Sequence, residues 1–423
     1  MRKMHKILSV AMATAMTMSL VACGGSADND ADVTDKEETT EETTEETGSE
    51  ETGSEETGSE ETGSEETGSS EEVTDMKVAM VTDYGDITDM SFNQTTYEAC
   101  KAYCDENGVE FSYFKPADNS TDDRVSSIEQ AIDEGYNVIV MPGYAFAEAV
   151  VETAEDNPDV KFVALDVSQY DFDTANGGEE YSQPNVFSAI YQEELPGYMA
   201  GYAAVKLGYT NLGFLGGMAV PAVIRYGLGF VQGADAAAAE LGIEVTVNYA
   251  YGGQFYGDSD ITAVMDTWYQ GGTEVVFACG GGIYTSAAEA AQKVGGKVIG
   301  VDVDQQGTID GSYGEGMTIT SACKGLTATV NTLLSAIQNG EWDNYAGQIQ
   351  NLGLVSADDL SLNYVSLADS TLYNDDFTED DYKALVAAMF NGEVTVNNDS
   401  SNADPSSLGC ENVKIGTYQE SIK

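Results

Sequence analysis

Short apolar runs alternate with segments of helical spacing along most of the chain. The first run, Val78–Val81, ends in a polar loop, and the helical pattern Thr95–Tyr103 follows it. This unit of strand, loop and helix recurs downstream, which predicts the α/β class with doubly wound parallel sheets. The predicted strands are 78–81, 110–113, 138–141, 162–165, 186–190, 212–215, 245–249, 275–278, 298–301 and a further run at 317–320. The predicted helices are 95–103, 122–134, 147–154, 193–205, 224–241, 261–269, 286–294, 325–338 and a last one capped by Thr378 that stops at Asn391.

The series of strands and helices restarts at Leu212, after the helix predicted over 193–205, which divides residues 76–423 into two predicted lobes. We expect the first lobe to comprise about 76–195 plus 322–345, because the helix predicted over 325–338 is expected to return to it. The second lobe then takes about 196–321 and part of the C-terminal region. Strands of both lobes end in polar or glycine-rich loops, and ligands of open parallel sheets bind at that edge. Two such lobes joined by a hinge predict a ligand cleft between them.

Residues 1–75 do not show the alternation of strand and helix patterns. Basic residues precede an apolar stretch, 7–20, that is too short to span a membrane, and small residues then precede Cys23. This pattern is similar to a bacterial lipobox, which implies a cleaved signal peptide over 1–22 and a lipid such as palmitate on Cys23; the alternative is an ordinary signal peptide cut nearby. Residues 23–75 contain Gly-Ser-Glu-Glu-Thr in four tandem copies and predict a disordered acidic tether. We therefore expect a lipid-anchored protein on the extracytoplasmic face of the cell membrane, and the tether favours a Gram-positive cell surface.

Composition excludes several functions. The chain has 17 basic and 73 acidic residues and a formal net charge of −56, which argues against binding nucleic acid and, more weakly, phosphorylated ligands. Its only histidine, His5, lies in the predicted signal peptide, so Ser-His-Asp and Cys-His catalysis and the usual zinc sites are excluded. Cys100 and Cys104 share a helix face without a Cys-x-x-Cys spacing and are interpreted as buried thiols rather than metal or redox groups. No cofactor, metal site or catalytic residue is predicted.

Polar and aromatic residues at the ends of the predicted strands could hold a ligand. A carboxylate just past a buried strand, such as Asp302, can accept hydrogen bonds from ligand hydroxyls, although aspartate in such a place is also a common turn former. Phe92 and Phe255 lie in polar segments where core packing explains them poorly, so two rings could sandwich a flat heterocycle; Tyr226 or Tyr256 could serve instead. The candidate ligand-binding residues are Asp83, Phe92, Asn93, Asp166, Phe255, Gly281, Asp302 and Lys324.

Five motifs follow one another in order between Lys77 and Gln350. They are Val-Thr-Asp at 81–83 with Ser-Phe-Asn-Gln at 91–94, Pro-Gly-Tyr-Ala-Phe at 142–146 with Pro-Asp-Val-Lys-Phe at 158–162 and Asp166, Gly-Phe-Leu-Gly-Gly-Met at 213–218, Gly-Val-Asp-Val-Asp-Gln at 300–305 and Thr-Ser-Ala-Cys-Lys at 320–324. Together they resemble the basic membrane protein family of ABC-transporter substrate-binding lipoproteins, whose best-understood members bind purine nucleosides. The resemblance implies a type I periplasmic-binding-protein fold.

The resemblance also implies roles for the candidate residues. A base would stack between Phe92 and Phe255, with Asp83, Asn93 and Asp166 near its edge. The ribose would be held by Asp302, Gly281 and Lys324. Thr88, Met90 and Ala219 depart from the family pattern in the presumed cleft. The base preference therefore stays open, as does a ligand other than a nucleoside.

The sequence predicts a monomeric substrate-binding protein of an ABC importer, without enzymatic activity. Its lobes would close on a nucleoside and present it to a membrane permease. One alternative is a lipoprotein that senses a nucleoside or another small molecule. Less favoured alternatives are a surface nucleoside hydrolase that uses Asp302 and Asp304 with calcium, and an adhesive protein.

Overall fold

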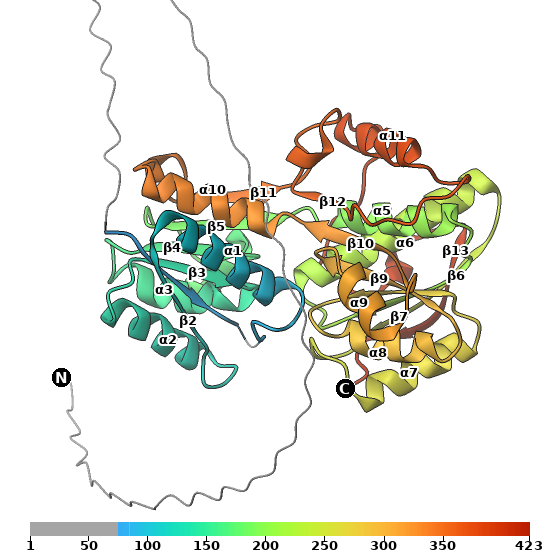
Figure 1. The fold of residues 1–423 in the computed structure, drawn as a ribbon, viewed down its shortest axis with the longest axis horizontal. Helices are drawn as coiled ribbons and strands as arrows, with labels where there is room; N and C mark the ends of the chain where they lie inside the picture. Colours follow the sequence, from blue (N-terminus) through green and yellow to red (C-terminus); the bar gives the residue numbers. More distant parts are fainter. Residues whose placement is uncertain (1–74, 84) are drawn as a thin grey trace, which may run out of the picture. The chain divides into compact units, whose positions relative to one another are not determined.

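The computed structural model describes residues 75–83 and 85–423, which lie in one compact unit. The predicted signal peptide, Cys23 and nearly all of the tether lie outside the described residues. Two sheets with helices on their faces build the described part, which confirms the predicted α/β class (Figure 1). No helix in this part of the chain is both long and apolar enough to cross a membrane.

The first lobe is built on a six-stranded, wholly parallel sheet in the order β11-β5-β4-β3-β1-β2. Its strands are β1 (Lys77–Val81), β2 (Glu110–Phe114), β3 (Val138–Pro142), β4 (Lys161–Leu165), β5 (Val186–Tyr191) and β11 (Ile349–Leu352). Its helices are α1 (Phe92–Asn107), α2 (Thr121–Asp133), α3 (Ala147–Ala154), α4 (Gln169–Ala175) and α10 (Leu326–Gln338). Alternate side chains of β1 enter different cores, Val78 on the α1/α10 face and Ala79 on the α2/α3 face, as the period of a strand requires.

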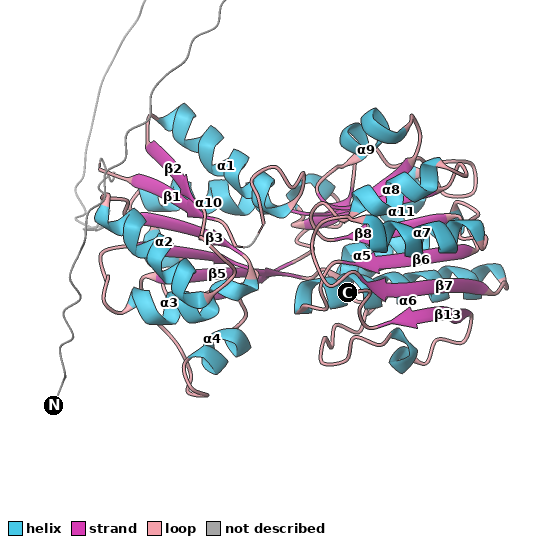
Figure 2. Ribbon diagram, turned by 90° about the horizontal axis from the view of Figure 1, so that it is seen from below, coloured by secondary structure: helices cyan, strands magenta, loops and turns pink. Residues whose placement is uncertain are grey.

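The second lobe is built on a seven-stranded sheet in the order β12-β10-β9-β8-β6-β7-β13, in which β12 alone pairs antiparallel. Figure 2 shows four of these strands, β8, β6, β7 and β13, side by side. Its strands are β6 (Asn211–Gly216), β7 (Val245–Tyr251), β8 (Val275–Cys279), β9 (Lys297–Asp302), β10 (Thr318–Lys324), β12 (Val365–Leu367) and β13 (Val413–Gln419). Its helices are α5 (Glu194–Lys206), α6 (Pro221–Leu241), α7 (Ser259–Gln270), α8 (Tyr284–Gln292), α9 (Gln306–Tyr313) and α11 (Glu379–Phe390). The capping box of Thr378 starts α11 and Asn391 ends it, as predicted.

The described chain passes between the two sheets three times. It leaves the first sheet between β5 and α5, returns between β10 and α10, and leaves again between β11 and β12. The helix α10 packs against α1 and the first sheet, as predicted. The first sheet also takes β11, which lies beyond residue 345, where the predicted first lobe ends. The first two crossings are short, whereas the third runs over residues 353–364. These three crossings join the lobes and are called the hinge segments below.

Some element boundaries were predicted wrongly. The helix α1 begins at Phe92 rather than Thr95, because the Asp89 carboxylate accepts hydrogen bonds from the backbone N–H groups of Ser91, Asn93 and Gln94. Phe92 and Asn93 therefore lie in the first helical turn instead of a loop. The strand β10 runs on to Lys324 because it stays paired with β9 as far as Cys323. The short helices α4 and α9 and the strands β11, β12 and β13 were not predicted.

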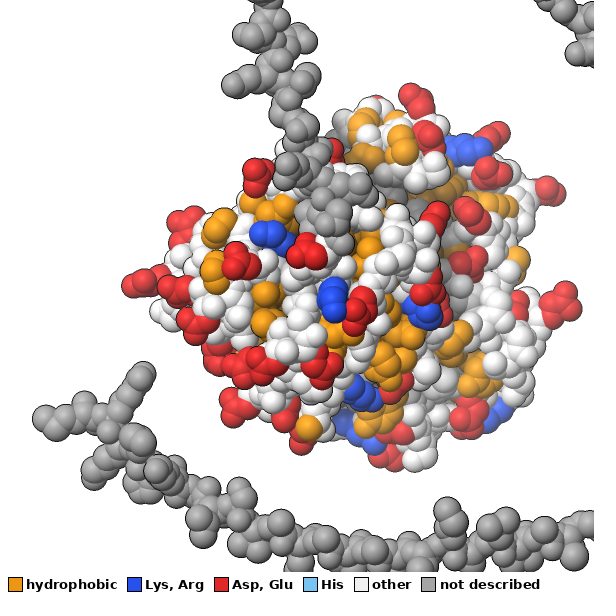
Figure 3. Space-filling view, turned by 60° about the vertical axis from the view of Figure 1, so that its left-hand side comes forward, with side chains coloured by type: hydrophobic (Ala, Val, Ile, Leu, Met, Phe, Trp, Pro, Cys, Tyr) orange, Lys and Arg blue, Asp and Glu red, His pale blue; other side chains and the backbone are white. Residues whose placement is uncertain are grey.

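Acidic side chains are spread widely over the face drawn in Figure 3, and basic ones are few. This matches the strong negative charge of the sequence. Inside the fold, Cys100 and Cys104 are fully buried free thiols in α1, which confirms that interpretation. Burial raises the pKa of both thiols, so neither is a reactive thiolate.

Candidate ligand-binding site

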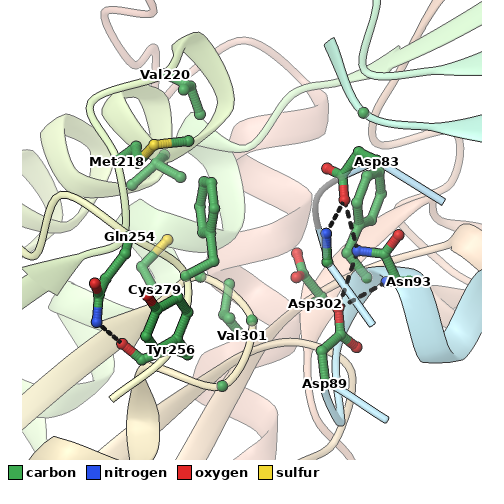
Figure 4. Close-up of a pocket in the computed structure, with 18 of the residues that line it drawn as sticks. Asp83, Asp89, Asn93, Met218, Val220, Gln254, Tyr256, Cys279, Val301 and Asp302 are labelled. Carbon is green, nitrogen blue, oxygen red and sulfur yellow. Dashed lines mark hydrogen bonds between the residues drawn. The ribbon is translucent and has the colours of Figure 1, made fainter. Parts of the chain in front are cut away.

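A cavity of about 710 Å³ lies at the carboxyl ends of strands from both sheets (Figure 4). Residues of both lobes line it, and all the candidate residues predicted from the sequence are among them: Asp83, Phe92, Asn93, Asp166, Phe255, Gly281, Asp302 and Lys324. The cavity therefore gathers side chains that are far apart in the sequence, as the recurrence of polar groups at strand ends suggested. Tyr226 is buried in its wall and donates a hydrogen bond to the Ala322 carbonyl at 3.3 Å, whereas Tyr256 is mostly exposed.

Hydrogen-bond acceptors dominate the first-lobe side of the cavity. Asp83 lies two residues past the end of β1, and its Oδ1 accepts hydrogen bonds from the Gly85 N–H at 2.6 Å and from Asn93 Nδ2 at 3.1 Å. Asn93 Nδ2 also donates to Asp89 Oδ2 at 3.2 Å, which fixes the orientation of the amide (Figure 4). The Asn93 Oδ1 atom is buried and accepts no hydrogen bond from the described residues. A buried acceptor without a partner is costly, so this atom suits a donor on a ligand.

Three carboxylates surround the ammonium group of Lys324. Its Nζ lies 2.7 Å from Asp166 Oδ2, 3.4 Å from Glu193 Oε1 and 3.7 Å from Asp302 Oδ1. The Lys324 side chain is only 3% exposed, and its Nζ lies 4.5 Å from the centre of the Phe92 ring. Burial lowers the pKa of Lys324, but the attraction of the carboxylates outweighs it and the net shift is upward. Lys324 therefore stays charged and offers hydrogen-bond donors inside a buried site.

Asp166 and Asp302 occupy corresponding places in the two lobes. Asp166 directly follows β4 and Asp302 ends β9, and both have left-handed backbone angles, with φ of 63° and 66°. Such angles are uncommon for residues with a side chain, although aspartate adopts them more readily than most, and they cluster at functional sites. Asp166 Oδ1 is buried without a hydrogen-bond partner among the described residues. Asp302 Oδ2 accepts a hydrogen bond from Ser91 Oγ of the first lobe at 2.6 Å.

The ring of Phe255 rests on glycines at the ends of two strands. A Cβ atom on Gly280, after β8, would lie 2.7 Å from Phe255 Cδ1, and one on Gly217, after β6, would be closer still. A Cβ on Gly281 would meet the Phe255 carbonyl oxygen at 2.7 Å. Only glycine leaves room for the ring here. The backbone thus supports the ring from below and presents it as a platform to the cavity, which suits stacking by a flat ligand.

Sequence reasoning missed two residues next to this site. Ser91 was expected as a helix cap, but its hydroxyl binds Asp302 in the other lobe. Glu193 was taken as the start of a helix, yet its side chain is fully buried between Lys324 and Arg225. Each has an ordinary local explanation, Ser91 as a helix cap and Glu193 as a polar residue at the start of a helix, so no local signal separated them from surface positions.

The site suits a neutral ligand that carries several hydrogen-bond donors and a flat ring. Its carboxylates disfavour a phosphate, and the lysine is already paired with them. No cluster of three or more His, Cys, Asp or Glu residues that could hold a metal ion occurs in the described part. Asp304 and Asp302 have separate contacts. Asp304 Oδ1 accepts hydrogen bonds from Ser370 Oγ and the Gln306 N–H.

This two-lobed fold also occurs among solute-binding proteins of known structure. A solved structure with this fold is the ABC transporter solute-binding protein of Aeropyrum pernix K1, with a TM-score of 0.59, 20% identity and coverage of 77% of this chain and 88% of that one. Residues 76–395 match the family described as ABC transporter substrate-binding protein, PnrA-like. The chain belongs to this family, which confirms the resemblance seen in its motifs.

Two proteins that are similar to this chain in sequence have descriptive names. The ABC transporter nucleoside-binding protein BmpA of Lactococcus lactis subsp. cremoris is 30% identical over 246 residues, which are 55% of this chain and 65% of that relative. An uncharacterized lipoprotein of Pyrococcus horikoshii is 27% identical over 293 residues, 66% of this chain and 67% of that protein. This chain thus spans just under two thirds of the length of the Lactococcus relative.

Asp83→Asn is expected to raise the free energy of unfolding at about pH 7.5, and the gain is expected to shrink towards about pH 4.5. Burial raises the pKa of Asp83 to about 6, above its value of about 3.9 in an unfolded chain. A carboxyl group with a raised folded-state pKa loses stabilisation as the pH rises through that window, and asparagine escapes this loss. Urea unfolding of both proteins at the two pH values measures the difference. An equal gain at both pH values would show that Asp83 does not titrate between them.

Proposed function

We propose that the protein is the lipid-anchored receptor of an ABC importer, which captures a nucleoside, preferably a purine nucleoside, and delivers it to a membrane permease. The observation that carries this proposal is the pairing of an aromatic platform, Phe255 on its glycine floor, with a rim of carboxylates around one buried lysine. A base can stack on the ring while donors on its edge meet Asp83 and the partnerless Asn93 Oδ1. The ribose diol can pair with Asp302 and Lys324, because hydroxyl groups both donate and accept.

The name of the Lactococcus relative supports a nucleoside as the ligand, and the lipoprotein name of the Pyrococcus relative supports an anchor on Cys23 at the extracytoplasmic face. Ligand binding would act by hinge closure, because only the closed form lets one molecule contact Phe92 and Phe255 together. The protein would work as a monomer, since one chain supplies every residue of the site. The nucleoside hydrolase alternative gains no support from the separate contacts of Asp302 and Asp304.

Calorimetric titration of residues 75–423 tests the proposal. The protein is first unfolded, dialysed and refolded to remove bound ligand, and then titrated with adenosine, guanosine, inosine, cytidine and uridine, with ribose, riboflavin and AMP as controls. We expect a purine nucleoside to bind with micromolar or tighter affinity, about −8 kcal/mol or better, and AMP at least about tenfold more weakly. Absence of binding to every nucleoside would overturn the assignment.

A further inference from the structure

A second layer of buried charge lies behind the cavity and does not line it. Glu193 follows β5 at the first crossing between the lobes, and its side chain is 0% exposed. Its Oε2 accepts a hydrogen bond from Arg225 Nε at 2.7 Å, and its Oε1 lies 3.4 Å from Lys324 Nζ. Lys324 ends β10 at the second crossing, directly before Gly325. Glu193 and Lys324 therefore join two of the three hinge segments.

We propose that Glu193 is a positioning residue for the ligand site: held by Arg225, it fixes the Lys324 ammonium group at the junction of the lobes and so sets ligand affinity from outside the cavity. This inference rests on the proposed function only for the identity of the ligand. Burial keeps water from replacing Glu193, because Glu193 is fully buried and the Arg225 side chain is only 15% exposed. A charged pair in such surroundings is costly to break, since the remaining charge is left without a partner.

The donor count of Lys324 gives Glu193 its role. A lysine ammonium has three N–H donors. Asp166 Oδ2 and Glu193 Oε1 are within hydrogen-bond distance of Nζ, whereas Asp302 Oδ1, at 3.7 Å, is not. One donor therefore remains for a ligand hydroxyl beside Asp302. Without the contact to Glu193, the Lys324 side chain could turn away from the cavity, since its Nζ also lies 5.4 Å from the centre of the Tyr191 ring and 5.9 Å from that of the Tyr226 ring.

Glu193→Gln tests this role with little change in shape. The amide oxygen of glutamine can still accept the hydrogen bond from Arg225, but its NH₂ group then faces Lys324 and repels it. We expect the affinity for the nucleoside that wild-type protein binds best to fall about tenfold, or 1.4 kcal/mol. The matched control is Glu194→Gln, which changes the next carboxyl group along the chain; it is also buried, at 4% exposed, and its described contacts do not include Lys324. Its affinity is expected to stay within about twofold of wild type, which is about 0.4 kcal/mol.

Two measurements separate positioning from general damage. In a Lys324→Met background, Glu193→Gln should change the affinity by less than about twofold, because the group it positions is gone. The second measurement is reductive methylation of Lys324, read by mass spectrometry with the exposed Lys383 as internal standard. It needs neither a ligand nor the Lys324→Met background. We expect Lys324 to react at least about threefold faster in Glu193→Gln, since loss of a neighbouring carboxylate favours the neutral amine.

The outcomes distinguish this inference from the proposed function. A full tenfold effect of Glu193→Gln in the Lys324→Met background, or unchanged methylation of Lys324, would overturn the positioning role. Wild-type protein that binds no nucleoside would overturn the proposed ligand, yet the methylation experiment would still decide the role of Glu193.

Discussion

Gly201→Ala is expected to lower the free energy of unfolding by about 3 kcal/mol, the largest effect we expect from adding a single methyl group to this protein. Gly201 lies in α5, where that helix crosses α6. A Cβ atom there would lie 2.8 Å from the carbonyl carbon of Phe230 and 3.0 Å from the Ala234 nitrogen, both backbone atoms of α6. Backbone atoms inside a helix cannot turn aside, so the two helices would have to separate.

The close contact between α5 and α6 is reciprocal, which makes an added methyl group difficult to accommodate. Gly197 and Gly201 of α5 face the backbone of α6, while Gly229 and Gly233 of α6 face the backbone of α5. Separation at one glycine would therefore open the packing at the others. Alanine is intrinsically the better helix former by about 1 kcal/mol, and this gain is too small to offset the lost packing.

Gly311→Ala is the matched control for Gly201→Ala. Gly311 lies inside the helix α9, and a Cβ atom there would meet no other atom within 4 Å. The same chemical change should therefore raise the free energy of unfolding by up to about 1 kcal/mol. Urea unfolding of both variants, with equal m-values, gives the comparison. Equal effects of the two substitutions would show that the backbones of α5 and α6 do not meet closely at Gly201.

The sequence predicted the structure best where a local pattern of apolar and polar residues matches an element of the fold. Apolar runs such as Val78–Val81 predicted buried strands, and the polar groups after them were expected to meet because parallel strands end at one edge of a sheet. That argument needs no knowledge of side-chain contacts. It placed Asp83, Asp166 and Asp302 near one another although they come from three separate units of the chain, and all three line the cavity.

The contacts that complete the site depend on tertiary structure and left no local trace. Glu193 sits in an acidic pair that reads as the solvated start of a helix, and only the crossing of two hinge segments buries it. Serine is a common helix cap, but the Asp89 carboxylate already accepts hydrogen bonds from N–H groups at the start of α1. The Ser91 hydroxyl is therefore free to bind Asp302. Strand β13 was missed because residues 413–419 lie far along the chain from their partner β7.

Lys324→Met is expected to lower ligand affinity at least about a hundredfold, or 2.7 kcal/mol, and the free energy of unfolding by about 3–5 kcal/mol. Methionine fills a similar volume but supplies neither the charge nor the donors. Asp166 would lose its ion pair at 2.7 Å, and Glu193 and Asp302 would lose their nearby cation. The remaining carboxylates are almost fully buried and would repel one another.

The loss of stability in Lys324→Met should depend on pH in a definite direction. Burial already raises the pKa of Asp166, and Lys324 opposes that rise, so removing the lysine lifts this pKa further. A carboxyl group with a folded-state pKa above its unfolded value holds its proton more tightly when folded, and stability falls as the pH rises through that window. The deficit relative to wild type should therefore be larger at about pH 7.5 than at about pH 5.

Urea unfolding at both pH values, together with calorimetry on the refolded protein, measures these effects. Lys383→Met is the control, because Lys383 forms an exposed pair with Glu379 in α11 and its loss should leave the free energy of unfolding almost unchanged at either pH. A deficit that is the same at both pH values would mean that the carboxylates around Lys324 are solvated rather than buried together. An unchanged affinity would remove Lys324 from the ligand contacts and leave it as a purely structural cation between the lobes.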